Sequence, residues 1–152
     1  MITVQITGIA AAMKKFSPEE LDKRKVAAMN ESLAMLKGMV QERTPVDRGI
    51  LRGSIFTELR GEPANLRGIV APGPATKEYA PVMELGRKPG GKMPPVSAIA
   101  AWAHRKGIMI SAFVLARSIA RKGIKGHFMF RDAARKGKGR VLAIWKKHLS
   151  TL

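Results

Sequence analysis

Residues 43–55, R-T-P-V-D-R-G-I-L-R-G-S-I, decide how this chain folds, because a helical pattern ends in them and a strand pattern begins. Pro45 lacks a backbone donor and disfavours the α conformation at Thr44, while Asp47 and Gly49 are typical turn residues. The sequence therefore predicts that a helix ends here. Leucine and isoleucine side chains after the turn would then enter a sheet that shares one core with this helix. These side chains are Leu51, Ile55 and Leu59.

The helix that ends at this turn has a strong start signal at residues 16–21, F-S-P-E-E-L. Ser17 suits the N-cap, Pro18 the first helical position, and Glu20 completes a capping box. Phe16 and Leu21 can form a hydrophobic staple across this start. An apolar stripe follows at helical spacing, made of Met29, Leu33, Leu36 and Val40, with Met35 and Met39 on its flanks. We predict one long helix whose stripe forms the centre of the core.

Three segments have strand patterns. Residues 1–7 alternate apolar and polar side chains, with Gly8 as the expected end of the strand. Residues 50–59 and 66–71 are separated by Arg60, Gly61, Glu62 and Pro63, which suit a hairpin connection. The sequence predicts a small antiparallel sheet packed on the long helix.

The middle of the chain contains shorter elements. Residues 78–86, E-Y-A-P-V-M-E-L-G, predict an extended or single-turn element that stops at Gly86. Residues 87–95, R-K-P-G-G-K-M-P-P, predict an exposed, mobile basic loop. Their two glycines lie in no Walker or G-x-G-x-x-G pattern, so we interpret this segment as a loop and not as a phosphate cradle.

The last third of the chain is predicted to be helical. Ser97 and Ser111 are expected to cap two helices that each end in basic residues followed by glycine. The apolar sides of these helices would be Ile99, Trp102 and Ala103 in one, and Phe113, Val114 and Ile119 in the other. A final helix is expected from about Phe130 to Leu149. Its apolar side would comprise Val141, Ile144, Trp145, His148 and Leu149.

Two glycines weaken the prediction for this final helix. Gly137 and Gly139 each cost about 1 kcal/mol relative to alanine inside a helix. We therefore expect this helix to be bent, broken or ordered only by a partner.

A chain of 152 residues with 45% apolar content fits one domain with a hydrophobic core. The predicted fold class is α+β: a small antiparallel sheet on one long N-terminal amphipathic helix, with additional C-terminal helices. The expected single domain, 1–152, comprises a strand, helix and sheet core (1–86), an exposed basic loop (87–95) and a basic helical part (96–152). The absence of cysteine excludes disulfides, and no signal peptide or membrane anchor is expected.

The positive charge is concentrated in the second half of the chain. The net charge is +17, and residues 86–152 carry 16 basic residues against the single acid Asp132, whereas residues 1–85 carry 12 basic and 10 acidic residues. This surplus indicates a polyanionic neighbour, either nucleic acid or an acidic protein surface. The alternative is a solvated basic face that keeps the protein soluble.

No pattern for catalysis or metal binding is present. The histidines His104, His127 and His148 lie far apart in the sequence, and no metal-ligand spacing surrounds them. Ser54, Asp47 and His104 have no nucleophile elbow or oxyanion hole to make them a triad. The sequence predicts neither an enzyme nor a metal or cofactor site.

Three ordered blocks resemble the tail-completion, or head–tail joining, proteins of tailed bacteriophages. The family pattern is T-P-V-D-T-G-x-L-x-x-S-I, then Y-A-x-x-x-E-x-G-T, then P-F-x-x-x-A. The corresponding segments here are T-P-V-D-R-G-I-L-R-G-S-I (44–55), Y-A-P-V-M-E-L-G (79–86) and G-I-K-G-H-F-M-F-R-D-A (123–133). The chain departs from the pattern at Arg48, Arg87 and His127, which affects local turns and contacted neighbours.

The resemblance implies a small α+β virion protein of the phage neck or tail, assembled in the host cytoplasm. It implies a ring, with six copies as the expected number, that contacts connector and tail-tube proteins, lies near genome DNA and contacts no membrane. The motif residues implied to be structural are Thr44, Pro45, Asp47, Gly49, Leu51, Ser54, Ile55, Tyr79, Glu84, Gly86 and Phe128. Candidate contacts to partners or DNA are Arg87, Lys88, Lys92, Lys136, Lys138 and Arg140.

Two alternatives stay open. A tail terminator or minor tail protein shares the virion context with the joining protein. A free basic protein that binds nucleic acid non-specifically belongs to another class, and it predicts tight, strongly salt-dependent binding by the monomer.

Overall fold

The computed structural model describes residues 1–6 and 16–150. The predicted end of the first strand at Gly8 lies outside these residues. The chain forms two compact units, one made of Met1–Lys77 with Met129–Leu152 and the other of Glu78–Phe128. The assignment of residues 1–152 to a single domain stays a prediction.

The described residues of the first unit form three strands and three α-helices. In chain order they are β1 (Ile2–Gln5), α1 (Pro18–Arg43), α2 (Ile50–Ser54), β2 (Phe56–Arg60), β3 (Arg67–Ala71) and α6 (Met129–Leu149). The second unit contains α3 (Ala80–Leu85), β4 (Gly86–Arg87), α4 (Val96–Arg105), α5 (Ala112–Lys122) and β5 (Ile124–Lys125). The predicted α+β class, with a long N-terminal helix and further C-terminal helices, is confirmed.

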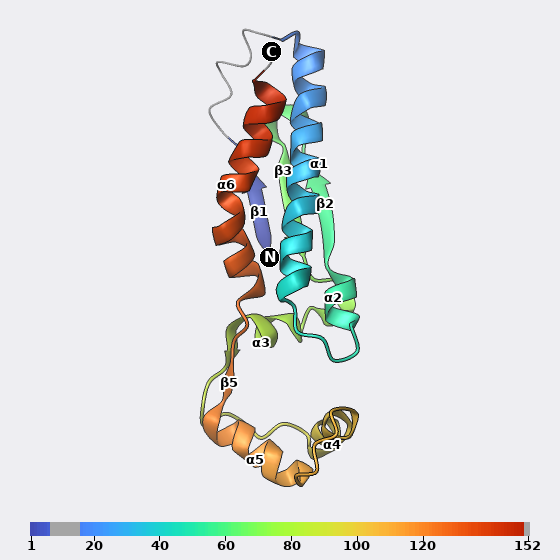
Figure 1. Cartoon of the computed structure of the whole chain (residues 1–152), viewed down its shortest axis with the longest axis vertical. Coiled ribbons are helices and arrows are strands. Elements are labelled where there is room, and N and C mark those ends of the chain that lie inside the picture. Colours follow the sequence, from blue (N-terminus) through green and yellow to red (C-terminus); the bar gives the residue numbers. More distant parts are fainter. Residues whose placement is uncertain (7–15, 151–152) are drawn as a thin grey trace. The chain divides into compact units, whose positions relative to one another are not determined.

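The sheet of the first unit is antiparallel and has the order β1-β3-β2. Ile2 is opposite Val70 on one side of β3, and Phe56 is opposite Ala71 on the other. Helices α1 and α6 lie side by side and cover one face of this sheet (Figure 1). The sheet therefore has two outer edges, one on β1 and one on β2.

Helix α1 begins and packs largely as its sequence predicts. The Ser17 hydroxyl accepts a hydrogen bond from the Glu20 amide at 3.3 Å. The Glu20 carboxylate pairs with Arg24 one turn later, and the Arg24 guanidinium lies 4.4 Å from the centre of the Phe16 ring. The predicted stripe is buried, and Met39 joins it, while Met35 is half-buried. The stripe therefore faces the core, as expected.

The prediction that residues 50–59 form one strand is wrong at its first half. Residues 50–54 wind into the short helix α2, and the strand begins only at Phe56. Gly49 adopts a left-handed φ of 75°, and the Gly53 amide donates to the Gly49 carbonyl at 2.8 Å, which closes the helical turn. Leu51 and Ile55, four residues apart, are both buried by this turn. An apolar spacing of four suits a helical turn as well as a strand, and here the glycine favours the turn.

The expectation of a broken final helix is also wrong, whereas bending and ordering by a partner stay predictions. Helix α6 is continuous over 21 residues. Gly137 is buried in its middle, at a close approach to α1. Glycine lowers the intrinsic helix propensity of this segment, but Gly137 also permits α6 to pack closely on α1. Tertiary packing therefore overrides the low helix propensity.

The second unit also differs from prediction in detail. Helix α4 begins at Val96 with Pro95 at its N-cap, so Ser97 lies inside the first turn and does not cap it. Ser111 occupies the N-cap of α5 as predicted, but its side chain makes no capping hydrogen bond. Gly107 and Gly123 follow the two helices with φ of 65° and 75°, as the predicted glycine stops require.

Candidate partner-binding surface

The first motif block joins the end of α1 to the core of the first unit. The Thr44 side chain is buried, and its hydroxyl donates to the Val40 carbonyl at 2.8 Å and lies 3.3 Å from the Met129 sulfur. Pro45 follows directly and Asp47 is exposed in the turn. Thr44 thus links the last turn of α1 to the first residue of α6.

Ser54 connects the same block to the proline-rich segment after β3. Its hydroxyl donates to the Leu51 carbonyl at 2.8 Å and shares a hydrogen bond of 2.7 Å with the Thr76 hydroxyl. Gly73 lies so close that an added Cβ would be 3.0 Å from the Ser54 carbonyl oxygen. This serine holds two loops together.

The second and third motif blocks meet inside the second unit. Strand β4 pairs with β5, so that Gly86 is opposite Lys125. The amides of His127 and Phe128 donate to the carbonyls of Met83 and Glu84 at 2.9 and 3.0 Å. Gly86 has φ 78°, and a Cβ there would overlap the Ile124 carbonyl oxygen. The second and third motif blocks, which lie far apart in the sequence, therefore contact each other at one compact junction.

Two further motif residues have unusual environments. Phe128 is the one described residue other than glycine with positive φ, at 49°. Tyr79 precedes α3 and is half exposed. The roles that the resemblance implies for the motif residues stay predictions, but most of these residues lie at turns and junctions.

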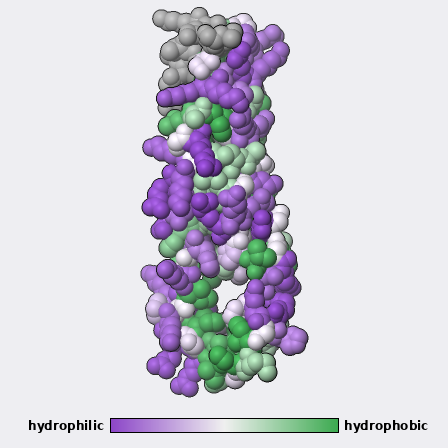
Figure 2. All heavy atoms as spheres, viewed as in Figure 1, coloured by the Kyte–Doolittle hydropathy of each residue, from purple (hydrophilic) through white to green (hydrophobic). Residues whose placement is uncertain are grey.

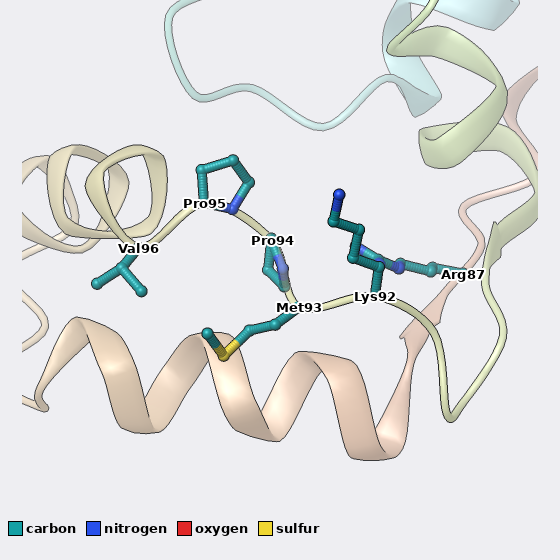
Figure 3. Close-up of a pocket in the computed structure, with 6 residues that line it drawn as sticks. All are labelled: Arg87, Lys92, Met93, Pro94, Pro95 and Val96. Carbon is teal, nitrogen blue, oxygen red and sulfur yellow. The ribbon is translucent and has the colours of Figure 1, made fainter.

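The basic loop borders an open hollow of about 530 Å³ (Figure 3). Its lining residues are Arg87, Lys92, Met93, Pro94, Pro95 and Val96. In Figure 3 the Arg87 side chain reaches along the loop toward Lys92. Two of the predicted contact residues are therefore close neighbours, whereas Lys88 is exposed and does not line the hollow.

The loop is anchored near its middle. The Gly90 amide donates to the Ala120 carbonyl of α5 at 2.8 Å. Gly91 leaves room for Arg87, whose Nε would be 3.2 Å from an added Cβ. Most residues of 87–95 are exposed, Arg87 and Pro94 are half-buried, and the predicted mobility stays a prediction.

The other predicted basic contacts lie on α6, in the first unit. Lys136, Lys138 and Arg140 are all exposed. Lys136 and Arg140 are one turn apart and share a side of the helix, whereas Lys138 lies on the other side and lines a groove against β1. The three side chains therefore form no single patch.

An exposed apolar cluster around the start of α5 escaped sequence reasoning. Phe113 and Val114 were expected on the inward side of the helix, but 52% and 55% of their surface is exposed. Met109 and Ile110, in the preceding loop, are 98% and 56% exposed. Figure 2 shows hydrophobic side chains gathered over the α4–α5 segment, at the lower end of the view.

This exposure follows from the composition of the second unit. The only residues that are buried within Glu78–Phe128, all of which the structure describes, are Ala80, Ala103 and Ala116. Three alanines cannot hide the larger apolar side chains of this unit. The signal in the sequence was the shortage of large residues on the inward side of α5, where Ala112, Ala116 and Ala120 recur every fourth position.

The charges of the described residues indicate ordinary surface ion pairs. His148 approaches the Glu31 carboxylate at 2.7 Å, and this hydrogen bond, with Lys147 nearby, lowers the pKa of Glu31. Arg60 similarly lowers the pKa of Glu58.

No group of three or more potential metal ligands occurs within residues 1–6 and 16–150. No helix in this part of the chain is long and apolar enough to cross a membrane.

Comparison with known proteins gave one family match. Residues 8–86, just over half of the chain, match the family described as "Bacteriophage HK97-gp10, putative tail-component". The match spans α1, the first two motif blocks and the sheet strands β2 and β3. No curated protein and no solved structure matches the chain.

Proposed function

Because the chain belongs to the bacteriophage HK97-gp10-like family of tail components, we propose that it is a subunit of the ring that completes the tail and joins it to the head. Family membership is the observation that carries this proposal. It makes the protein a structural component of the virion that contacts other virion proteins. The ring, the joining step and the passage of DNA through the ring are the proposed parts.

The sheet of the first unit supports ring formation. Strands β1 and β2 form its outer edges, so each copy offers two different edges for backbone hydrogen bonds. A contact between β1 of one copy and β2 of the next is heterologous, and such contacts close into a ring at a suitable rotation. The apolar side of α6, an alternative ring contact, packs instead on α1 within the same chain.

The distribution of charge on α6 supports a divided role for its basic residues. Lys138 lies on the opposite side of the helix from Lys136 and Arg140, so all three cannot face one channel. A channel lined only by basic side chains would also bind phosphates and slow passing DNA. We propose that part of this charge contacts acidic neighbouring proteins and part faces the genome.

The test is removal of the gene from the phage that encodes it, followed by electron microscopy of the lysate. We expect separate filled heads and tails, with joining restored when purified protein is added. Joined, infectious particles without the protein would overturn the proposal. Localisation of the protein in a map of intact particles then distinguishes a joining ring from a tail terminator or a minor tail position.

The high net charge favours a second candidate function, non-specific binding of nucleic acid. This function requires tight DNA or RNA binding by the purified protein, with a steep loss of affinity as salt rises. The ring proposal expects weak binding by monomers.

The proposed contacts of the basic residues on α6 can be tested by charge reversal. The variant K136E/K138E/R140E should impair head–tail joining, and a normal yield of infectious particles would count against these contacts.

A further inference from the structure

The start of α5 presents an apolar cluster that nothing in its own unit covers. Met109, Ile110, Phe113 and Val114 are each more than half exposed. Large apolar side chains that gather on one exposed surface are typical of a protein–protein interface. Aromatic residues and methionine are also enriched in such interfaces.

Two arginines continue this cluster along the helix. Phe113, Arg117 and Arg121 follow one another at intervals of four residues, so they share one side of α5. Both arginines are exposed, and neither pairs with a carboxylate among residues 1–6 and 16–150. We call the side chains Met109, Ile110, Phe113, Val114, Arg117 and Arg121 the α5 surface.

A second copy of this chain is poorly suited to cover the α5 surface. Every copy brings a net charge of +17 and only eleven acidic residues. Five of these acids already pair with basic residues of their own chain: Glu20, Asp22, Glu31, Glu58 and Asp132. Contact between two such surfaces would also bring arginines together, and like charges across an interface are unfavourable.

Nucleic acid fits the arginines but not the apolar cluster. Phosphates attract basic side chains, and bases stack on aromatic rings. Met109, Ile110 and Val114 are aliphatic, so they offer no stacking surface and gain most from an apolar protein socket. The combination of an aliphatic cluster with unpaired arginines is complementary to an apolar depression bordered by carboxylates.

We infer that the α5 surface docks onto an acidic face of a different virion protein and not onto another copy of this chain. The inference rests on the proposed function, because it assigns the docking step of the ring to one helix. Phe113 and its aliphatic neighbours fill the apolar socket. Arg117 and Arg121 pair with carboxylates at its border, which selects the partner by charge.

The test uses the full chain in particles assembled by the phage, with the photoreactive amino acid benzoylphenylalanine in place of Phe113. After illumination, mass spectrometry identifies the attached peptides. We expect crosslinks to one other virion protein, at a segment rich in Asp and Glu. Crosslinks to this chain or to DNA, or no crosslink from protein that is present in the particle, would overturn the inference while leaving the ring proposal intact.

Absence of the protein from particles would instead overturn both the proposed function and this inference. Two variants that retain the crosslinker sharpen the test. R117E/R121E should reduce crosslinking at least tenfold, whereas the matched control R117K/R121K should retain most of it. Equal crosslinking by the charge-reversed variant, with its fold verified by circular dichroism, would contradict the role of the arginines.

Discussion

Gly137 of α6 lies against Leu36 of α1 so closely that a Cβ at position 137 would be 2.5 Å from Leu36 Cδ2. Both residues are buried in the first unit. This contact limits how closely the two longest helices approach. From the sequence alone, Gly137 was expected to weaken its helix, whereas in the structure it permits that helix to pack closely.

The first prediction compares two glycines of the same helix. Gly137→Ala adds a methyl group that must displace Leu36, and overpacking of this kind costs about 1–3 kcal/mol. Gly139→Ala, the matched control, meets no atom within 4 Å and gains about 0.5–1 kcal/mol from helix propensity. Urea denaturation should therefore show that G137A is less stable than G139A. Equal stability of the two variants would contradict the close contact between α1 and α6.

The second prediction compares two glycines that have nearly the same positive φ. Gly86 and Gly90 have φ of 78° and 77°, so alanine is strained at both, by about 1–3 kcal/mol. At Gly86 the new Cβ also overlaps the Ile124 carbonyl, whereas at Gly90 it meets no atom within 4 Å. We expect Gly86→Ala to expose residues 78–128 to limited proteolysis and Gly90→Ala to leave them largely protected. The reverse order would show that the β4–β5 pairing does not require this glycine.

The third prediction concerns the hydrogen bond between Ser54 and Thr76. In a double-mutant cycle with Ser54→Ala and Thr76→Val, the coupling free energy should be about 0.5–1.5 kcal/mol, because each single variant already breaks the shared bond. Thermal denaturation of the four proteins provides the measurement. Purely additive effects would mean that the two hydroxyls act independently, and that Ser54 serves its own helix through Leu51 alone.

The fourth prediction concerns pH. The hydrogen bond from His148, assisted by Lys147, lowers the pKa of Glu31 from 4.5, so the folded state binds this proton less readily than the unfolded state. The stabilising contribution of Glu31 is therefore present above pH 4.5 and is lost as the pH falls through the folded-state pKa. Glu31→Gln should lower the melting temperature at pH 7, at low salt, and have little effect near pH 3.

The control for this experiment is Glu62→Gln. No ion pair of Glu62 occurs in the part of the chain that the structure describes, so this variant removes one carboxylate without removing an ion pair. A pH dependence for Glu31→Gln no larger than that of Glu62→Gln would contradict the pairing with His148.

Local signals predicted much of the first unit. The Ser17 cap, the stripe from Met29 to Val40 and the strand at 66–71 were predicted from side-chain periodicity and capping chemistry. All three occur in the structure, the strand at Arg67–Ala71. The helical turn at 50–54 was missed because the spacing of Leu51 and Ile55 suits a helix as well as a strand. The helical turn depends on the left-handed conformation of Gly49, which glycine can adopt but which the sequence does not require.

The candidate surface was predicted only in part. The roles of the six basic residues as contacts stay predictions, and the structure brings two of them, Arg87 and Lys92, to one hollow. It separates Lys138 from Lys136 and Arg140, which helical periodicity predicts once α6 is continuous. Phe113 and Val114 were assigned to the inward side because their apolar nature suggested a core that the second unit does not have.

The small buried core of the second unit, made of three alanines, affects the newly made protein before it is incorporated into the virion. Nine basic residues against two acids accompany the uncovered apolar side chains of Glu78–Phe128. Newly made subunits that meet through this segment repel one another, and this repulsion opposes their aggregation. The positive charge of this segment therefore opposes contact between two copies and favours contact with an acidic surface.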